Sequence, residues 1–285
     1  MLVCLCSATA CAQDMSGDHH HNEAASPSPD TNVSQDWAKQ RLAKSPRHQE
    51  WVKIKNGNRE VNSFVVYPEN KNKATAVIVI HEIFGMSDWV QSLTDQLAEA
   101  GYVAIAPDLL SGMGPNGGGT SSLTGNAIGQ AISALPPDQI TADLNAVAAY
   151  ISKVPASNGK IVVTGYCWGG GQSFRYATNN PNIKAAFVFY GPAPASADGT
   201  PDKAALAKIT APVYGFYAGN DARINATLPK TTEAMTELKK TYDPVTYEGA
   251  GHGFMRAGEA PDANEANKKA RDDAWARWKK LLAGV

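Results

Sequence analysis

Cys167 is the residue whose surroundings point most directly to chemistry. It stands in the segment GYCWGG at 165–170, directly after the apolar run IVV at 161–163. A nucleophilic residue between glycines at the end of a strand is typical of a nucleophile elbow, a sharp strand-to-helix turn that holds the nucleophile in a strained backbone conformation. Glycine fits at 165 and 169 because a side chain there would collide with the neighbouring strand and helix. A buried structural cysteine, the alternative, leaves these glycines unexplained.

A nucleophilic thiol needs a base, and the base needs an acid that orients it, because a thiol of ordinary pKa is only a few per cent thiolate at neutral pH. His252, in the glycine-rich segment 249–254, is the only histidine that follows Cys167 in the sequence. Asp221 lies between them, directly after a predicted strand. This order of nucleophile, acid and histidine is that of α/β hydrolases. The sequence therefore predicts a Cys167, Asp221, His252 triad, the alternative for His252 being a solvent-exposed loop residue.

The segment HEIFG at 81–85 follows another apolar run and is predicted to lie beside the elbow. In such folds the oxyanion hole uses the backbone N–H after the nucleophile and a second N–H from a loop of this kind. Trp168 and Ile83 are therefore the predicted donors. His81 and Glu82 also begin an HExxH zinc motif, but Gly85 occupies the place of the second histidine, so no metal site is expected.

Strand-like and helix-like segments alternate from residue 50 onward. Segments 51–55 and 61–67, joined by Asn-Gly-Asn at 56–58, are predicted to form an antiparallel hairpin. Later apolar runs are short, as in parallel strands covered on both faces. The predicted strands are 76–80, 102–106, 161–163, 186–190, 213–217 and 245–247. This alternation predicts an α/β hydrolase fold, with a mostly parallel sheet, an N-terminal antiparallel hairpin and helices on both faces.

Helices are predicted where apolar residues recur every three to four positions. Such stripes lie at 89–100, 140–151 and 235–238. Ser87 or Asp88 is expected to cap the first of these helices. The last helix is predicted to begin at Asp262, with Glu265 completing a pair that resembles a capping box.

Composition excludes several classes of partner. The 285 residues include 26 basic and 27 acidic side chains, and no block of like charge occurs in the part predicted to fold, so no affinity for nucleic acid is expected. No later apolar run approaches the eighteen residues of a transmembrane helix. The length allows one α/β domain with a full core. We expect a monomer that needs no cofactor.

The N-terminal segment 1–12 is short, apolar and rich in small residues, which predicts an export signal and a periplasmic or extracellular protein. Cleavage before Cys11 would instead give a lipoprotein. Residues 13–46 have the composition of a disordered linker, and the histidines at 19–21 are expected to be a solvated patch rather than a metal site. The folded domain is predicted over 47–285. Three of the four cysteines lie in the export segment, so the exported chain would keep Cys167 as its single thiol.

Taken together, HEIFG, GYCWGG and GHGFMR resemble the dienelactone hydrolase family over residues 50 to 282. The resemblance implies an α/β hydrolase fold and a triad of Cys167, Asp221 and His252. It implies that Glu82 contacts the resting thiol and swings away when substrate enters, so that thiolate forms mainly in the complex. It also implies that Arg256 binds a substrate carboxylate, a task suited to a guanidinium group. Without the resemblance, Glu82 and Arg256 could be surface charges.

The chain departs from this family in the loop at 108–119. Dienelactone-active members carry a second carboxylate-binding arginine there, and this loop has none. Dienelactone itself is therefore in doubt as a substrate, whereas ester or lactone cleavage is not. The loop also contains a GxGxxG pattern, but it has a proline and no acidic ribose partner, so a lid or pocket rim is expected rather than a nucleotide site.

The sequence thus predicts a cysteine-dependent carboxylic ester hydrolase that acts on small lactones or esters bearing a carboxylate, through an acyl-enzyme. Two alternatives remain. One is a ligand-binding or thiol-sensing protein without turnover, since an accessible low-pKa thiol can be oxidised reversibly. The other is a carboxylesterase of broad specificity on the same fold.

Overall fold

The computed structural model describes residues 35–285, in which eight strands form one sheet in the order β1-β2-β4-β3-β5-β6-β7-β8. The predicted export segment, most of the predicted linker and the histidines at 19–21 lie outside the described residues. The strands are β1 Gln49–Asn56, β2 Arg59–Val66, β3 Ala74–Ile80, β4 Val103–Pro107, β5 Ser157–Tyr166, β6 Ala186–Phe189, β7 Val213–Ala218 and β8 Tyr242–Tyr247.

The N-terminal hairpin is confirmed. Strands β1 and β2 pair antiparallel from Gln49 with Val66 to Asn56 with Arg59, which leaves Gly57 and Asn58 as a two-residue turn. Gly57 has a φ of 59°, a left-handed value that glycine adopts without steric cost. Strand β2 also pairs antiparallel with β4, and this joins the hairpin to the rest of the sheet.

The remaining strands run parallel, as predicted. From β3 the chain crosses to β4 on one side and then returns to β5 on the other side. Strands β6, β7 and β8 follow outward in chain order. The order of strands therefore reverses around β3, and ligands of open α/β sheets bind beyond the carboxyl ends of strands at such a reversal. The loops after β3 and β5 carry the two motifs singled out from the sequence.

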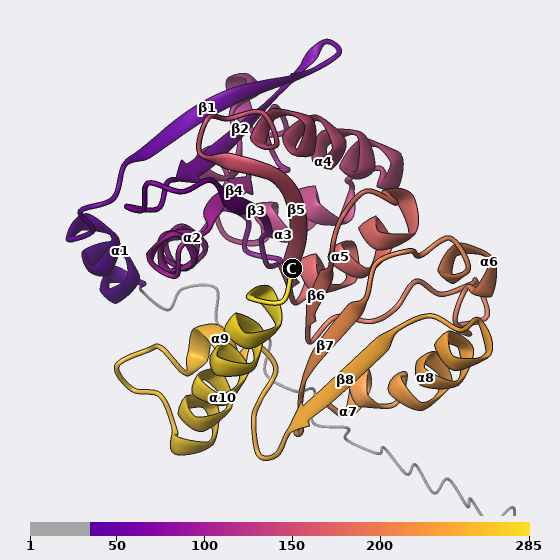
Figure 1. Ribbon diagram of the computed structural model, residues 1–285. Coiled ribbons are helices and arrows are strands. Elements are labelled where there is room, and N and C mark those ends of the chain that lie inside the picture. Colours follow the sequence, from indigo (N-terminus) through magenta and orange to yellow (C-terminus); the bar gives the residue numbers. More distant parts are fainter. Residues whose placement is uncertain (1–34) are drawn as a thin grey trace, which may run out of the picture. The chain divides into compact units, whose positions relative to one another are not determined.

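Helices cover both faces of the sheet, as Figure 1 shows. The α-helices are α1 Asp36–Ala43, α2 Asp88–Glu99, α3 Asn126–Ser133, α4 Pro137–Ile151, α5 Trp168–Asn179, α6 Lys203–Leu206, α7 Ala222–Asn225, α8 Leu228–Glu237, α9 Phe254–Ala257 and α10 Glu265–Leu282. Short 3-10 turns, η1 Pro115–Gly117 and η2 Thr120–Ser122, lie in the loop after β4.

Each face of the sheet has its own apolar core. Val77 and Val79 of β3 pack in a cluster with residues of α1, α2 and α10, whereas Ile78 and Ile80 pack in a second cluster with residues of α4, α5 and α8. Successive residues of a strand point to opposite faces, so an uninterrupted apolar strand supplies both cores. All seven residues of β3 are buried, as expected for a central parallel strand.

The predicted linker ends earlier than expected, because residues 36–43 form helix α1. Ala38 is fully buried, and Trp37 and Leu42 pack against the core cluster of α2 and α10. The side-chain oxygen of Gln35 accepts a hydrogen bond of 2.8 Å from the backbone N–H of Trp89. A few apolar side chains in a mainly polar segment thus suffice to anchor it, and composition alone did not indicate this.

The last helix begins three residues later than predicted. Asn264, not Asp262, is the N-cap of α10, and its side chain accepts a hydrogen bond of 2.8 Å from the backbone N–H of Asn267. Asp262 lies in the turn that precedes the helix. For α2 the structure selects Ser87 over Asp88, since the Ser87 side chain accepts from the backbone N–H of Val90.

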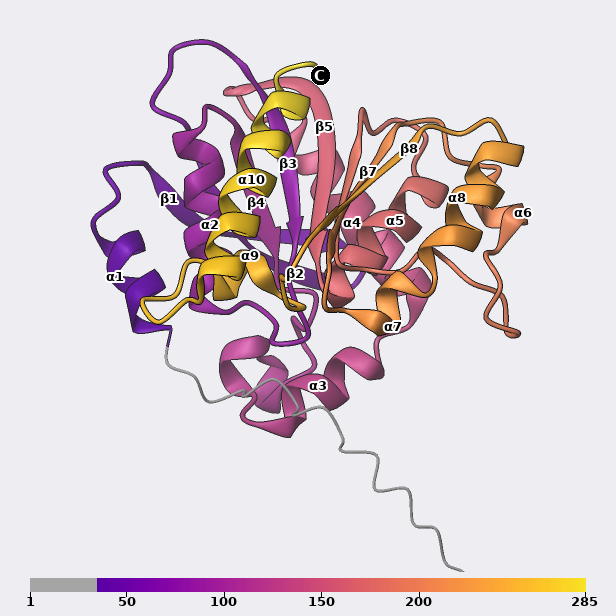
Figure 2. The ribbon, with the colours of Figure 1, turned by 90° about the horizontal axis from the view of Figure 1, so that it is seen from below.

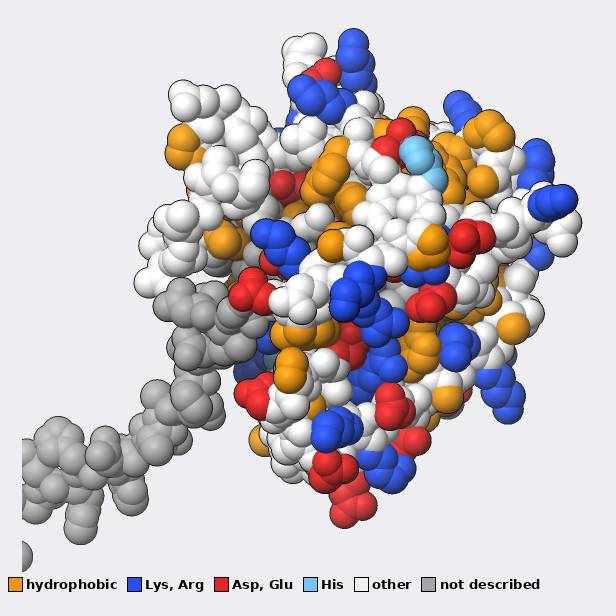
Figure 3. Space-filling model, turned by 90° about the vertical axis from the view of Figure 1, so that its left-hand side faces the viewer, with side chains coloured by type: hydrophobic (Ala, Val, Ile, Leu, Met, Phe, Trp, Pro, Cys, Tyr) orange, Lys and Arg blue, Asp and Glu red, His pale blue; other side chains and the backbone are white. Residues whose placement is uncertain are grey.

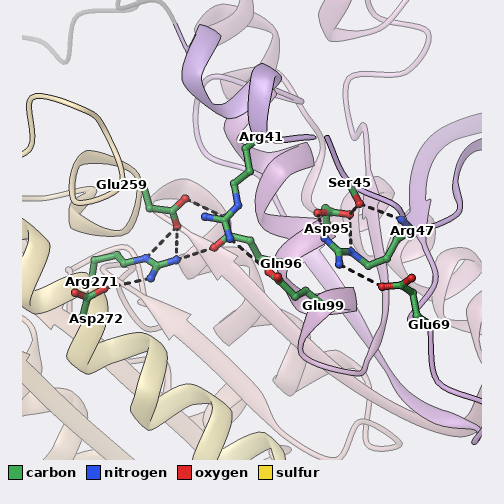
Figure 4. Close-up of polar contacts among 10 residues, drawn as sticks. All are labelled: Arg41, Ser45, Arg47, Glu69, Asp95, Gln96, Glu99, Glu259, Arg271 and Asp272. Carbon is green, nitrogen blue, oxygen red and sulfur yellow. Dashed lines mark hydrogen bonds and ion pairs between the residues drawn. The ribbon is translucent and has the colours of Figure 1, made fainter. Parts of the chain in front are cut away.

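Two buried polar clusters, which we call the framework clusters, tie α2 to its neighbours (Figure 4). In the first, the Asp95 carboxylate accepts from the Ser45 hydroxyl at 2.5 Å and from two nitrogens of Arg47 at 2.9 and 2.7 Å. The Asp95 side chain is 2% exposed. This cluster fixes the segment that leads from α1 into β1.

The second framework cluster joins α2 to α10. The Glu259 carboxylate accepts from Arg271 Nε at 3.1 Å, from Arg271 Nη2 at 3.0 Å and from Gln96 Nε2 at 3.0 Å. Arg271 Nη2 also donates to the Gln96 side-chain oxygen at 2.6 Å. Charges buried in this way are stable only when their partners are complete, and here every carboxylate oxygen has a donor.

The face drawn in Figure 3 shows basic and acidic side chains interspersed, with no large area of one sign. Within residues 35–285, no helix is both long enough and apolar enough to cross a membrane.

Candidate active site

Cys167 occupies a strained turn between β5 and α5. Its φ is 56°, a left-handed value that is uncommon for a residue with a side chain. A Cβ at position 165 would overlap the backbone of residue 169, and a Cβ at position 169 would overlap the carbonyl oxygens of Ile80 and His81. These glycines therefore let the turn pack against the end of β3. The geometry is that of the predicted elbow, with the sulfur at the N-terminus of α5.

His252 and Asp221 are brought together from the loops after β8 and β7. His252 Nδ1 lies 2.5 Å from Asp221 Oδ2, and the Asp221 side chain is 7% exposed. Asp221 Oδ1 accepts a hydrogen bond of 3.2 Å from the backbone N–H of Ile224. The loop that bears His252 is held from α10, because the backbone N–H of Gly251 donates to Asn267 Oδ1 at 2.9 Å. The imidazole Nδ1 is thereby bound to the Asp221 carboxylate, and the other nitrogen, Nε2, stays available to accept or donate a proton.

The two predicted oxyanion donors lie beside the sulfur. The backbone N–H groups of Trp168 and Ile83 both interact with Cys167 and act to lower its pKa, because a hydrogen-bond donor favours the thiolate. They come from the first residue of α5 and from the loop after β3. Two N–H groups from separate loops thus converge on the space next to the nucleophile.

Glu82 and Arg256 form a buried ion pair next to this space. Arg256 Nε donates to Glu82 Oε2 at 2.8 Å, and the side chains of Arg256 and Glu82 are 19% and 2% exposed. The Arg256 guanidinium also lies 5.0 Å from the centre of the Phe84 ring. Glu82 is thus a buried carboxylate rather than a surface charge. Among the described residues no hydrogen bond joins Glu82 to the thiol, so its predicted contact with Cys167 stays a prediction.

The Cys167 thiol is held in its neutral form. Burial is the main cause that raises its pKa, to about 11, and the negative charge of Glu82 raises it further. The two backbone donors and the charge of Arg223 act in the opposite direction but are outweighed. At pH 7 a pKa of about 11 leaves roughly one thiolate in ten thousand molecules. The resting thiol is therefore a poor nucleophile until something changes its surroundings.

The structure adds two residues that the sequence analysis missed. Tyr190 follows β6, is fully buried with a φ of 42°, and its ring lies edge-on to His252 with the centroids 5.0 Å apart. Arg223, two residues after Asp221, is exposed and its charge reaches Cys167. Their positions directly beyond strands β6 and β7 were the available signal, since functional residues of parallel sheets gather at the strands' carboxyl ends.

The loop after β4 contacts the segment after Glu82 at one end and borders an open hollow at the other. At its far end, Thr120 Oγ1 accepts from the backbone N–H of Met86 at 3.1 Å, which ties the loop to the segment after Glu82. Gly112 and Gly117 instead line an open hollow of about 1030 Å³ shared with the hairpin and the start of α4, and no predicted site residue lines that hollow. Figure 2 shows the loop after β4, with α3, at the same end of the sheet as α7 and α9. Its role as a lid or rim stays a prediction.

No group of three metal-binding side chains occurs among residues 35–285. The carboxylates of the site are instead paired with His252 and Arg256. The described residues thus place a thiol beside two backbone N–H donors, and a histidine on a buried carboxylate.

Comparison with known sequences places the chain among hydrolases. The model of the dienelactone hydrolase family matches residues 61–285. A protein from Methylorubrum extorquens named "Putative carboxymethylenebutenolidase" is 31% identical over 210 residues, which cover 71% of each chain. A protein of the same name from Saccharolobus solfataricus is 31% identical over 258 residues, with 79% of this chain and 95% of that one covered.

Solved structures show the same fold. The crystal structure of a "Putative Dienelactone Hydrolase" from Klebsiella pneumoniae has a TM-score of 0.72 and 27% identity, covering 84% of this chain and 99% of the other. A dienelactone hydrolase-like promiscuous phosphotriesterase from metagenomic libraries has a TM-score of 0.71 at 16% identity, covering 84% and 98%. The predicted fold class is therefore confirmed.

Proposed function

The chain is a hydrolase of the dienelactone hydrolase family, and on that premise we propose that it cleaves small carboxylic esters or lactones through an acyl-enzyme on Cys167. Two sets of contacts support the proposal: His252 in the loop after β8 binds Asp221 in the loop after β7, and the N–H groups of Ile83 and Trp168 interact with Cys167 at the elbow. Each supplies one part of a cysteine triad with an oxyanion hole.

The proposed reaction has two halves. In the first, the Cys167 sulfur bonds to the carbonyl carbon, the oxyanion accepts from the N–H groups of Ile83 and Trp168, and the ester C–O bond breaks. His252 takes the thiol proton, and the resulting imidazolium gives that proton to the departing alkoxide oxygen, which in a lactone stays attached to the acyl group. In the second half, His252 takes a proton from water, the hydroxyl oxygen bonds to the acyl carbon, the C–S bond breaks, and the imidazolium returns its proton to the sulfur. Asp221 stabilises the imidazolium throughout.

Activation of the thiol is the first requirement of this scheme, because burial and Glu82 keep its pKa at about 11. We propose that bound substrate displaces the Glu82 carboxylate from the vicinity of the sulfur, so that thiolate forms in the complex. The Glu82 pairing with Arg256 supports this, since a substrate carboxylate that binds Arg256 competes with Glu82 for the same guanidinium. Substrate binding and nucleophile activation would then be one event.

The substrate class follows from the cations near the sulfur. Arg256 lies beside the buried carboxylate of Glu82, and Arg223 is an exposed cation whose charge acts on Cys167. We propose that esters or lactones bearing a free carboxylate are preferred, with Arg223 taking part in place of the arginine that the 108–119 loop lacks. An activated neutral ester should therefore show a higher KM than the same ester with a carboxylate on its acyl chain.

Turnover of a nitrophenyl ester by the wild-type chain and by Cys167→Ala tests the assignment. We expect the substitution to reduce kcat/KM to the uncatalysed background, because the covalent step is lost. A rapid burst of nitrophenol equal to one per protein would identify the acyl-enzyme, and mass spectrometry would place the acyl group on Cys167. Undiminished activity of Cys167→Ala would refute the proposal.

Thiol sensing is the weaker alternative. Oxidation of a cysteine follows its thiolate fraction and its exposure, and here burial and a neighbouring carboxylate suppress the thiolate. A sensor would need its thiol pKa lowered rather than raised.

A further inference from the structure

His81 is a buried histidine that the proposed triad does not use. It follows β3 directly, is fully buried, and has one hydrogen bond: its Nδ1 lies 2.8 Å from the backbone carbonyl oxygen of Glu82. Its Nε2 is buried without a partner among the described residues. A buried polar side chain with one unsatisfied atom destabilises the folded protein. We therefore ask what role its one hydrogen bond has.

The direction of that bond follows from its partner. A carbonyl oxygen only accepts, so Nδ1 must carry the proton and donate. Burial lowers the pKa of His81, and the charge of Asp108 opposes this shift without reversing it. The ring is therefore neutral, with its one proton on Nδ1 and a bare Nε2.

The carbonyl that His81 binds belongs to the same peptide unit as a proposed oxyanion donor. The oxygen of Glu82 and the N–H of Ile83 are opposite ends of one trans peptide, so they point in opposite directions. The N–H interacts with Cys167 and the carbonyl accepts from His81. The backbone N–H of Gly85 donates to the same carbonyl at 3.1 Å. Hydrogen bonds to the oxygen polarise the peptide and make its N–H a stronger donor.

The same imidazole also contacts the second donor residue. The rings of His81 and Trp168 are stacked, with centroids 5.4 Å apart and an interplanar angle of 18°. The backbone carbonyl of His81 lies against Gly169, where a side chain would not fit. One side chain thus contacts Trp168, whose N–H faces the sulfur, and the peptide unit that carries the second such N–H, that of Ile83.

We propose that His81 is a positioning residue of the oxyanion hole: its Nδ1–H holds and polarises the peptide between Glu82 and Ile83, so that the Ile83 N–H is a preorganised donor to the oxyanion. This inference rests on the proposed acyl-transfer function. It assigns His81 no contact with substrate and no proton transfer. The benefit falls on the transition state, because negative charge appears on the carbonyl oxygen only there.

Two substitutions with opposite properties test the proposal. His81→Phe keeps a ring that stacks on Trp168 but loses the donor, and it also removes the unpaired Nε2. We expect kcat for a nitrophenyl ester to fall about ten- to thirtyfold, less than the 10²- to 10³-fold that follows loss of an oxyanion donor itself. We expect KM to stay within about twofold and the melting temperature to be retained, because the ground-state complex and the packing are little changed.

His81→Asn has the reverse combination. Its amide nitrogen can stand where Nδ1 stands and donate to the Glu82 carbonyl, but the ring and its stacking are lost. We expect the melting temperature to fall while kcat stays within about threefold of wild type. Tyr176→Phe is the matched control: it removes a hydroxyl that donates to Asn145 Oδ1 at 2.9 Å between α5 and α4, and it should lower stability without changing kcat.

A trifluoromethyl ketone, which forms a tetrahedral adduct with the thiol, gives a second measurement. Its inhibition constant should rise in His81→Phe by about the factor lost in kcat, and stay near wild type in His81→Asn. If His81→Phe keeps full kcat, or if His81→Asn loses as much as His81→Phe, the positioning role is wrong. Either result would leave the Cys167-dependent activity of the wild-type chain intact, so it is distinct from failure of the proposed hydrolase mechanism.

Discussion

The framework clusters and the Glu82–Arg256 pair are both buried arginine–carboxylate sites, but they are built differently. In the framework clusters each carboxylate oxygen of Asp95 and Glu259 has a donor, and Figure 4 shows that the partners come from several elements. At the site, Glu82 receives a single hydrogen bond within the described residues, from Arg256 Nε.

In the proposed mechanism, this difference separates charges that hold the fold from charges that take part in substrate binding. Removing one partner from a completed buried pair destabilises the fold, and such a pair has no carboxylate oxygen without a donor. The incomplete pair beside the neutral thiol instead leaves a guanidinium for which a substrate carboxylate competes in the proposed mechanism. Substitutions in the two regions should therefore have opposite outcomes, with activity lost at the site and stability lost in the framework clusters.

Asp221→Asn should be the most damaging to activity. The amide cannot hold the imidazole in the required tautomer or stabilise its charged form, so kcat/KM for a nitrophenyl ester should fall about 10³-fold or more. Thermal unfolding should change little by comparison. A variant that keeps more than a tenth of wild-type activity would show that Asp221 is not the triad acid.

Asp95→Asn should have the opposite outcome. Loss of the charge leaves Arg47 with the exposed Glu69, 3.8 Å away, as its acidic partner, and the free energy of unfolding should fall by about 3 kcal/mol, as for other broken buried pairs. Urea denaturation measures this, and kcat/KM at a temperature where the variant is folded should equal that of the wild type. A large loss of activity at retained stability would place the framework clusters in the site.

Glu82→Gln should make the resting thiol more reactive. In wild type the thiol has a raised pKa of about 11, so it stays protonated as the pH rises, and its alkylation by iodoacetamide should accelerate until near that pH. Removing the carboxylate charge lowers the pKa of the thiol, and a tenfold larger acid dissociation constant raises the alkylation rate at pH 8 about tenfold. The measurement uses chains in which Cys4, Cys6 and Cys11 are replaced.

Glu69→Gln is the control for this experiment, because Glu69 is an exposed acid that faces Arg47 in the first framework cluster. It should leave the pH profile of alkylation unchanged. Equal profiles for Glu82→Gln and wild type would show that Glu82 does not raise the pKa of the Cys167 thiol.

Asn264→Ala should produce the smallest effect. Loss of the N-cap of α10 should cost about 1 kcal/mol and lower the melting temperature by about 2 to 4 °C, as measured by calorimetry. Since Asn267 in the same turn binds the loop of His252, a fall in kcat larger than about twofold would show that this cap supports the site as well as the fold.

The sequence was sufficient to predict the fold and to select residues that the structure brings together. The strands themselves and the ends of β3, β7 and β8 follow from local pattern, and parallel strands place those ends on one edge of the sheet. The order of the strands depends on long-range pairing that the sequence analysis did not predict. The Cys167 elbow was equally local, because the glycines at 165 and 169 are a requirement of the turn itself. The pairing of His252 with Asp221 followed from chain order.

Other features depend on contacts that no local pattern reveals. The pairing of Gln96 with Arg271 joins positions 175 residues apart, and α1 is ordered by packing against α2 and α10 rather than by its own composition. The raised pKa of Cys167 results from burial among elements distant in sequence. In the sequence His81 appears only as the start of an incomplete HExxH motif, and its hydrogen bond to the Glu82 carbonyl is visible only in three dimensions.

The hold of Asn267 on the loop of His252 has a consequence for how the protein is made. The loop of His252 is fixed by the first turn of α10, and α10 follows β3, the elbow and that loop in the chain. Domains form as the chain emerges from its N-terminal side, so β3 and the elbow can take shape while the base still lacks its support. A ribosome that stops before α10 would therefore release a polypeptide in which the proposed nucleophile has its elbow but the proposed base lacks its support.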